Sequence, residues 1–575
     1  MFVKTQRDEE SRTHDRANAN AKRVVMTLIL ALVLPVLIVW AVYVRQFAQI
    51  TDMDAMDMAQ VARNVQSGNG FVTSVIRPLA TTRATGVTTA AGGLKTVRMQ
   101  DMVHPPLFIY AEALVLATGA SDNKVFLVSA LFFLLTIPVL YALSKEMFNA
   151  KVGQLTVFAY VTSLFMTNMI LTTGSATMAA FMFTLLCLMI LRFAQAAQPD
   201  GGVPSTRSVV VKAALCGVVF ALCYLTDYML LLALLPVAVC VYVAGKREGK
   251  AGLVVFLLAF LVVAGPWMIR NTSVTGSPFF GLRALEIGMG TKAHPAFSLY
   301  RSTVPQTVLG LVQETSGDLG RKVVQGIQVS YGTLPVLGQP YLVAFFIVGL
   351  FYSFRRNGVN ALRGMLIGSV ICVAMLGNLF MFQMGTLTAF APIMLAFAAA
   401  FFVRLLTDSK APNVIVAGVN VLAGVLMVIP LAAALAVPAP RISSTHEAET
   451  TVGRIVAPNS PIVSDRAFEM AWYAGRTSVW IPNADKDFEN LDGLYGLKAL
   501  YLSAALFPSN RTSENYDIWR EMYGQILPPA MHDQFARFDA GPYTGFGLFR
   551  GLDEKESGAI LSQRALLLLR EGAAR

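Results

Sequence analysis

Charge is scarce in this sequence. Asp, Glu, Lys and Arg make up 14% of the 575 residues, whereas 55% are hydrophobic. The apolar residues come in blocks of about 20, the length that an α-helix needs to cross a lipid bilayer. This pattern excludes a soluble enzyme of this size and predicts an α-helical multi-pass membrane protein.

Cysteine is also rare, and none of it lies in the polar C-terminal region. That region also lacks a glycine-rich nucleotide loop and a nucleophile elbow. The sequence therefore predicts no disulfide framework, zinc site or nucleotide site there. All five cysteines fall inside apolar blocks: Cys187, Cys216, Cys223, Cys240 and Cys372.

The net charge of +11 does not indicate a nucleic-acid partner. Most of the Lys and Arg residues lie in short loops between apolar blocks, where the positive-inside rule alone requires them. With the N-terminus in the cytoplasm, the cytoplasmic loops carry the positive charge. The outer turns near 173–177, 226–229 and 383–386 contain no Lys or Arg.

About eleven apolar blocks predict as many transmembrane helices. The first block follows a polar, basic stretch, residues 1–23, which we expect to be a disordered cytoplasmic tail. No small-residue cleavage site follows this block, so it is predicted to be an uncleaved anchor. The blocks are 24–44, 123–144, 153–172, 176–195, 210–227, 228–245, 251–270, 338–354, 361–382, 386–404 and 412–437.

An odd number of spans places the C-terminus outside the cytoplasm. Three long segments, 45–122, 271–337 and 438–575, are then predicted to face outward, which for a bacterial inner membrane means the periplasm. Residues 24–437 form the predicted transmembrane domain, whose outer loops are the first two of these segments.

The last segment, 438–575, is predicted to be a small α/β domain. Pro438, Pro440 and a Ser/Thr/Glu-rich run indicate a linker at its start. Short apolar runs then alternate with helical patterns, which is typical of α/β units. The predicted strands are 460–464, 477–481, 497–502 and 535–549, and the predicted helices are 467–474 and 518–526.

The first outer segment begins with an acidic amphipathic helix. Met58, Val61, Ala62 and Val65 recur at helical spacing and form one apolar stripe. Asp54 and Asp57 lie nearer the start of the same helix. Residues 51–54 have the spacing of a capping box, with Asp52 interpreted as a cap rather than a catalyst. The simpler interpretation of these acids is that they cap the helix and offset its dipole.

A second helix of this segment follows His104, Pro105 and Pro106. Its apolar stretch, 107–119, is too short to span a bilayer. A span there would also place every later loop on the opposite side of the membrane, against the positive-inside rule. The stretch is therefore predicted to lie in the membrane interface.

With this topology, the chain resembles the C-type glycosyltransferases (GT-C). It is most similar to the bacterial relatives of protein O-mannosyltransferases and of the lipid A aminoarabinose transferase, a family 39-like group. The resemblance is carried by DAMDMAQVARNV with GNGF at 54–71, HPPL at 104–107, RN with GSPF at 270–279, and PIVSD to WYAGR at 461–476. The sequence departs from the family at Ala55, in the acid-free turn 173–177, and at 385–388.

The resemblance implies transfer of a hexosyl or pentosyl group from a polyprenyl-phosphate donor to a lipid, glycan or protein acceptor on the outer side. It implies Asp54 as the general base, with burial expected to raise its pKa. Asp57 would orient the acceptor or, together with Asp54, bind Mg²⁺ or Mn²⁺. Arg270 and His104 would bind the donor phosphate. The alternatives are a snorkelling Arg270 at the end of a span and a His104 that only forms a turn.

Two other functions compete with this hypothesis. A transporter or flippase for a lipid-linked sugar should show inverted repeats and ionisable residues within its spans, and neither pattern is present. A non-catalytic relative that binds a lipid-linked sugar stays open, because the expected second acidic site is missing.

Overall fold

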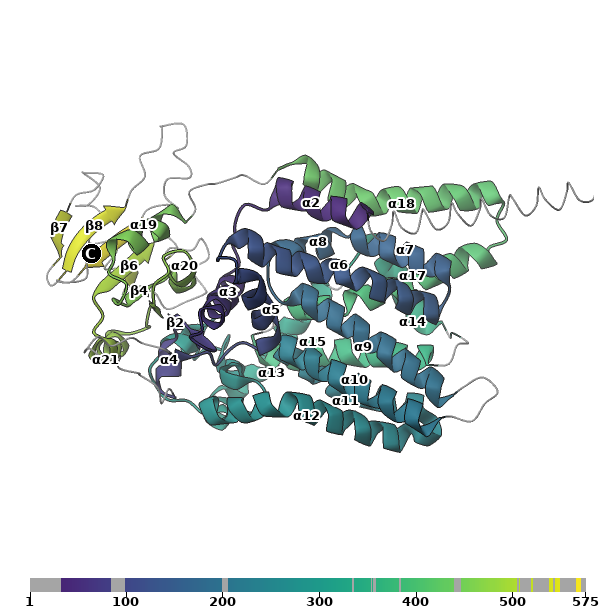
Figure 1. The fold of residues 1–575 in the computed structure, drawn as a ribbon, viewed down its shortest axis with the longest axis horizontal. Helices are drawn as coiled ribbons and strands as arrows, with labels where there is room; N and C mark the ends of the chain where they lie inside the picture. The colour runs from purple at the N-terminus through teal and green to yellow at the C-terminus, as the bar shows by residue number, and fades with distance from the viewer. Residues whose placement is uncertain are drawn as a thin grey trace, which may run out of the picture.

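The computed structural model describes most of the chain as a long helical bundle with a small α/β unit at one end, and α3 lies between the two (Figure 1). The described residues are 33–83, 99–198, 205–333, 336–352, 354, 358–381, 384–438, 446–503, 506, 519–520, 537–540, 543–548 and 565–569. The predicted cytoplasmic tail, 1–23, lies outside these ranges.

Seven helical segments in the described ranges are long and apolar enough to cross a membrane. They become eight if α7 (Ala150–Val161) and α8 (Leu164–Leu171), which meet at 50°, form one bent span. This confirms the multi-pass helical fold. The seven are α6 (Asp122–Met147), α9 (Ala176–Ala197), α10 (Thr206–Thr226), Tyr228–Thr275, Val359–Leu379, α17 (Ala391–Asp408) and α18 (Asn413–Ala436).

The 48-residue segment Tyr228–Thr275 contains two packed helices. The first consists of η2 (Tyr228–Ala233) and α11 (Leu234–Gly245), and the second is α12 (Gly249–Thr275). The turn η3 (Lys246–Glu248) joins them. Gly249 is required there, because a Cβ atom would lie 2.2 Å from the Tyr242 carbonyl oxygen.

Two of the predicted spans correspond to shorter helices: α2 (Leu34–Gln46), and η7 (Pro340–Leu342) with α14 (Val343–Phe351). Residues 24–32 lie outside the described ranges, so the total of about eleven spans stays a prediction. The segment Val359–Leu379 consists of α15 (Val359–Leu376) and η8 (Gly377–Leu379), and the short helix α16 (Met384–Thr388) follows it.

The two predicted outer loops contain most of the remaining non-bundle structure. The first holds α3 (Met53–Gln66), β1 (Val72–Thr73), β2 (Val75–Ile76), α4 (Pro78–Thr81), β3 (Met99–Gln100) and α5 (Pro106–Leu116). The second holds η4 (Gly281–Gly288), η5 (Ser298–Arg301) and α13 (Val308–Thr333). We did not predict α13 from the sequence.

The α/β unit is built on a seven-stranded sheet of order β2-β5-β4-β6-β9-β8-β7. Its first four strands are parallel, and the other three are antiparallel to their neighbours. The strands are β4 (Ile462–Ser464), β5 (Ser478–Trp480), β6 (Ala499–Ser503), β7 (Arg537–Ala540), β8 (Tyr543–Leu548) and β9 (Ala565–Leu569). The helices are α19 (Glu447–Ile455), α20 (Ala467–Trp472) and α21 (Asp485–Tyr495).

The predicted α/β class is confirmed, but several elements differ, and helix α21 and strand β9 were not predicted. The edge strand β2 comes from the first outer loop and pairs in parallel with β5. Part of the stretch that we interpreted as a linker forms α19, because Val452 packs into the apolar core under the sheet. Of the predicted helix 518–526, the described ranges include only 519–520.

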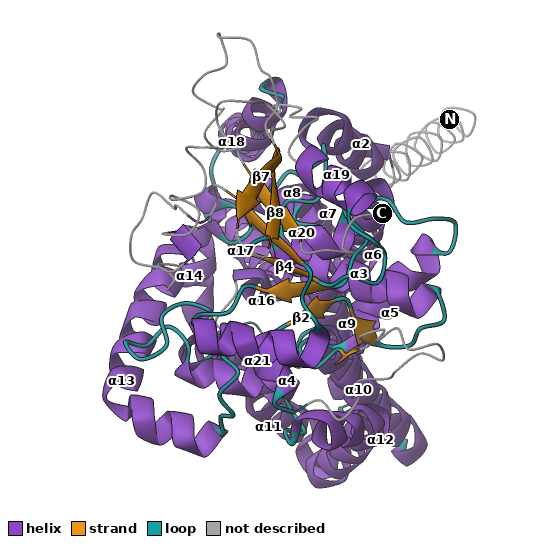
Figure 2. Cartoon of the chain, turned by 90° about the vertical axis from the view of Figure 1, so that its left-hand side faces the viewer, coloured by secondary structure: helices purple, strands orange, loops and turns teal. Residues whose placement is uncertain are grey.

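Helix α20 joins this unit to the bundle by packing on α3. The Trp472 indole and the Tyr473 hydroxyl both donate to the Asp122 carboxylate at the start of α6, each at 2.8 Å. Arg63 of α3 donates to the Trp472 carbonyl at 2.9 Å. Figure 2 looks onto this end of the molecule, with the strands in front of the bundle.

Candidate active site

Helix α3 holds two of the expected site residues. Its N-cap is Asp52, whose carboxylate accepts a hydrogen bond from the Ala55 backbone N–H at 2.9 Å. The capping box expected at Thr51 is therefore wrong, whereas the capping role of Asp52 is confirmed. Asp54 lies in the first turn of α3, and Asp57 lies one turn further along.

The His104 ring connects three aspartates, and we call Asp54, Asp57, Asp101 and His104 the acid cluster. Its Nε2 lies 3.3 Å from Asp54 Oδ1 and 3.4 Å from Asp57 Oδ2, while Nδ1 lies 3.2 Å from Asp101 Oδ1. Burial lowers the pKa of His104, but the Asp101 and Asp57 charges and the hydrogen bonds raise it to about 10. The ring is therefore an imidazolium at neutral pH.

Asp57 is fully buried and has further partners. The Arg77 guanidinium forms an ion pair with its Oδ2, and Gln60 donates to its Oδ1 at 3.0 Å. A buried carboxylate requires such partners, because ionisation without them would carry a large desolvation cost.

Asp54 is the accessible member of the acid cluster. Its side chain is 35% exposed, whereas those of Asp57 and Asp101 are 0% exposed. Burial raises its pKa, but the His104 hydrogen bond and the charges of His104, Arg283 and Arg77 lower it to about 2. The expected rise in this pKa is therefore wrong, because nearby cations outweigh desolvation.

Arg270 lies beside the cluster, near the C-terminal end of α12. Its guanidinium donates to the Asp101 carbonyl at 2.6 Å and to Gln100 Oε1 at 3.2 Å. It also stacks on Trp267, with 4.7 Å between the guanidinium carbon and the ring centroid. The fold thus brings together the four expected site residues, Asp54, Asp57, His104 and Arg270.

Several residues of this site were not predicted. Arg283 pairs with Glu286 at 3.1 Å, and the Tyr300 hydroxyl donates to Glu286 at 2.8 Å. Asp101 stands three residues before His104, a spacing that could have indicated it. Arg77 has no local pattern, because its partner Asp57 lies 20 residues earlier in the sequence, and Arg283 acts on the pKa of Asp54 from the second predicted outer loop.

Comparisons with known proteins agree with this architecture. The family model described as dolichyl-phosphate-mannose-protein mannosyltransferase matches residues 103–269. No curated protein matches the chain by sequence. The oligosaccharyltransferase of Archaeoglobus fulgidus in complex with Zn and sulfate has a TM-score of 0.55 at 12% identity, covering 82% of this chain and 68% of that one. The chain has the GT-C fold.

Two further structures are similar to this GT-C chain. AglB from Archaeoglobus fulgidus, in complex with an inhibitory peptide and a dolichol-phosphate, has a TM-score of 0.54 at 12% identity and covers 83% of this chain and 69% of that one. ArnT from Cupriavidus metallidurans bound to undecaprenyl phosphate covers 96% and 98%, at 13% identity and a TM-score of 0.42.

The residues of the GT-C chain do not fit the divalent cation expected at Asp54 and Asp57. In the described ranges, no group of three or more His, Cys, Asp or Glu side chains is arranged to hold a metal ion. The carboxylate of Asp57 is already paired with Arg77, and a charged His104 separates the aspartates. A divalent cation would have to displace these positive charges.

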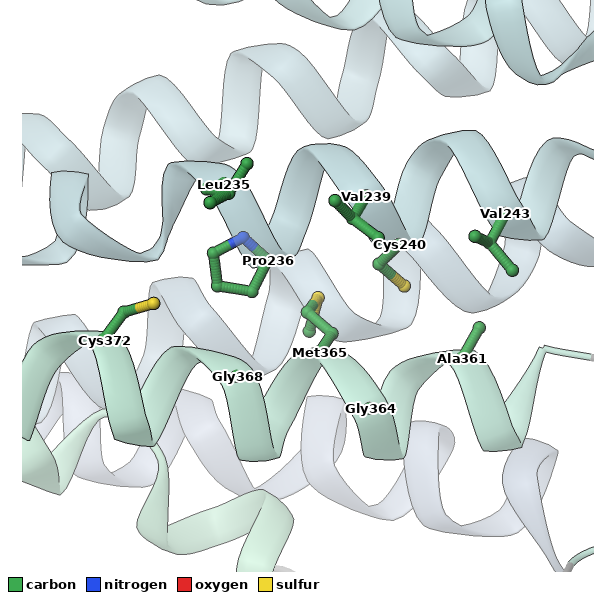
Figure 3. A pocket seen from close by; sticks show the side chains of 10 residues that line it. All are labelled: Leu235, Pro236, Val239, Cys240, Val243, Ala361, Gly364, Met365, Gly368 and Cys372. Carbon is green, nitrogen blue, oxygen red and sulfur yellow. The ribbon is translucent and has the colours of Figure 1, made fainter.

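An apolar groove of about 430 Å³ lies between α11 and α15 of the GT-C chain (Figure 3). Leu235 and Cys372 lie at one end of it, and Val243 and Ala361 lie at the other. The lining residues are Leu235, Pro236, Val239, Cys240, Val243, Ala361, Gly364, Met365, Gly368 and Cys372.

The Leu235 end of this groove points toward the acid cluster. Element η2, which leads into α11, starts at Tyr228, and the Tyr228 hydroxyl donates to the His104 carbonyl at 3.1 Å. At the corresponding end of α15, the Leu379 carbonyl accepts from Lys322, which also donates to the Glu286 carbonyl. The groove and the charged site therefore share one end of the bundle.

Proposed function

We propose that this chain is a membrane glycosyltransferase that moves a sugar from a polyprenyl-phosphate donor to an acceptor on the outer side of the membrane. One observation carries the proposal. Asp54, the partly exposed carboxylate of a buried acid cluster, is linked through His104 and Asp101 to Arg270, and the Leu235 end of an apolar groove lies toward the same end of the bundle. The GT-C fold and the match to the mannosyltransferase model support it.

The chemistry follows from these positions. An acceptor heteroatom attacks the anomeric carbon, and the bond from that carbon to the phosphate oxygen breaks. Polyprenyl phosphate leaves with the bonding electrons, and the acceptor proton passes to Asp54. With a pKa of about 2, Asp54 is ionised at neutral pH and accepts this proton as the new bond forms and the acceptor becomes acidic.

Positive charge must stabilise the departing phosphate. We assign this role to Arg270, because a planar guanidinium binds phosphate oxygens in a bidentate manner. Both ring nitrogens of His104 face carboxylates. We therefore propose that His104 fixes the orientation of Asp54, in place of the phosphate contact expected from the sequence.

The groove fits the lipid part of such a donor. From Leu235 to Val243 it follows eight residues of α11, or about 12 Å. Its lining is apolar, so an isoprenoid chain would bury carbon against carbon there, while its phosphate reaches the charged end. The dolichol-phosphate in the AglB complex is a ligand of this chemical class.

The three predicted outer segments meet at one end of the bundle, which supports their placement on one side of the membrane. Arg77 of the first contacts Tyr300 of the second and Phe468 of the third. We propose a bacterial inner-membrane protein with a cytoplasmic N-terminus, a bundle over 24–437 and a periplasmic unit over 438–575. The acceptor would be a lipid, glycan or protein that reaches this side.

The test is a transfer assay with the full chain in lipid nanodiscs. Undecaprenyl-phosphate hexoses and an undecaprenyl-phosphate aminopentose serve as donors, and cell-envelope fractions supply acceptors. We expect release of undecaprenyl phosphate together with labelled product. Movement of intact donor across a liposome membrane without consumption would favour a flippase, and saturable donor binding without consumption would favour a non-catalytic relative.

A further inference from the structure

Arg77 lies where the three outer segments meet, and its side chain is 6% exposed. It pairs with Asp57 of the first segment. Its guanidinium carbon also lies 5.5 Å from the Tyr300 ring centroid in the second segment and 5.4 Å from the Phe468 ring centroid in the third. One cation thus contacts a carboxylate of the acid cluster and an aromatic ring of the α/β unit.

The backbone at Arg77 is held by the α/β unit. Arg77 directly follows β2, whose Val75 and Ile76 pair with Ser478 and Val479 of β5. The Ser478 N–H also donates to the Ser74 carbonyl at 2.8 Å. Because β2 is the edge strand of this sheet, its position depends on the sheet being in place.

Tyr300, the second aromatic ring on Arg77, is held by the same unit. The next residue, Arg301, donates from Nε to the Ile481 carbonyl at 2.7 Å, immediately after β5. Thr303 Oγ1 donates to the Asp487 carboxylate of α21 at 2.6 Å. Both aromatic neighbours of Arg77 therefore depend on the α/β unit being docked.

We infer that Arg77 is a positioning residue, through which docking of the α/β unit sets the orientation of Asp57 and, through His104, of Asp54. The inference rests on the proposed function, because it names the part of the chain that controls the same site. In this arrangement the α/β unit is a condition for an ordered acid cluster as well as a candidate surface for the acceptor.

The geometry makes transfer sensitive to this contact. Asp57 is buried, so removal of the Arg77 charge leaves a carboxylate that must turn toward His104 or toward water. Either movement shifts His104, to which Asp54 is also bonded. A misplacement of about 1 Å in a catalytic site can lower the rate about 100-fold.

The first measurement compares variants of Arg77 and of one of its aromatic neighbours in the full chain. Arg77→Met should lower kcat by about 100-fold with donor KM changed less than about 3-fold, and Arg77→Lys should be intermediate. Phe468→Leu leaves the ion pair intact but removes one ring that holds it, and we expect a loss in kcat of about 10-fold. Donor binding, measured separately, should stay near native in each.

A matched control exists in the same unit. Phe468 and Phe488 each contact a tryptophan ring edge-on, Trp480 at 5.0 Å and Trp519 at 5.7 Å between ring centroids. The two differ in that the Arg77 guanidinium stacks on the Phe468 ring. Phe488→Leu should keep kcat within about 2-fold of native. Equal losses in Phe468→Leu and Phe488→Leu, with the melting temperature near native in both, would overturn the inference, because transfer would then not depend on the ring that contacts Arg77.

The second measurement does not require transfer. Hydrogen–deuterium exchange of α3 and β2 should be faster in Arg77→Met and Phe468→Leu than in the native chain, and unchanged in Phe488→Leu. Unchanged exchange of α3 in both of the first two variants would overturn the inference. If the variants show these changes in exchange but the native chain transfers no sugar, the result would overturn the proposed function and leave the positioning role of Arg77 intact.

Discussion

Replacing Asp54 with Asn is the most direct test of the proposed chemistry. The substitution keeps the shape of the side chain and removes the group that accepts the proton. General-base catalysis contributes about 10²- to 10⁴-fold, which corresponds to about 3–5 kcal/mol of activation free energy. We expect kcat to fall by this factor while the dissociation constant of the donor changes less than about 3-fold.

The fold should tolerate this change. His104 keeps its contacts with Asp57 and Asp101 at 3.4 and 3.2 Å. The lost pair involves a side chain that is 35% exposed, so after solvent screening it contributes about 1 kcal/mol or less to the free energy of unfolding. The melting temperature should therefore stay within a few degrees of native.

Asp52→Asn is the matched control, because Asp52 belongs to the same turn and caps α3. Asn caps a helix about as well as Asp, so this variant removes a neighbouring carboxylate without removing the cap. Both variants are assayed in nanodiscs by release of undecaprenyl phosphate. Near-native turnover in Asp54→Asn, or an equal loss in Asp52→Asn, would refute the assignment of Asp54 as the base.

Three further results are expected. Arg270→Gln should raise the donor KM about 10-fold or more. Arg270→Lys should be intermediate, because an ammonium keeps the positive charge but cannot bind two phosphate oxygens in the bidentate manner of a guanidinium. An unchanged KM would mean that Arg270 has only a structural role. Gly364→Leu should fill open space in the groove and weaken binding of long-chain donors more than that of short-chain analogues, whereas Gly424→Leu, also in open space but on α18, should not. Burial raises the pKa of Asp465 from 3.8 to about 7 despite hydrogen bonds from Ser503. The folded α/β unit thus holds a proton that the unfolded chain releases, so its stability should fall as pH rises from about 4 to about 7. Asp465→Asn should flatten this fall in thermal unfolding curves, and an unaltered slope would contradict it.

The sequence by itself determined the features that depend on local pattern. The lengths of the apolar blocks predicted the helical bundle, because crossing a bilayer requires about 20 apolar residues whatever lies beside them. The period of Met58, Val61 and Ala62 predicted α3, and two prolines placed the start of α5. The motifs around Asp54, His104 and Arg270 then indicated the GT-C fold.

The tertiary structure decided how those residues behave. The pKa of Asp54 falls to about 2 because folding brings His104, Arg283 and Arg77 close to it. Likewise, β2 adds an edge strand to a sheet whose other strands all come from Ile462 onward in the sequence. The Arg77 guanidinium then stacks on the Phe468 ring. No local pattern contains these contacts, because the energy of a charge depends on its distance in space from other charges and from water, and only the complete fold sets those distances.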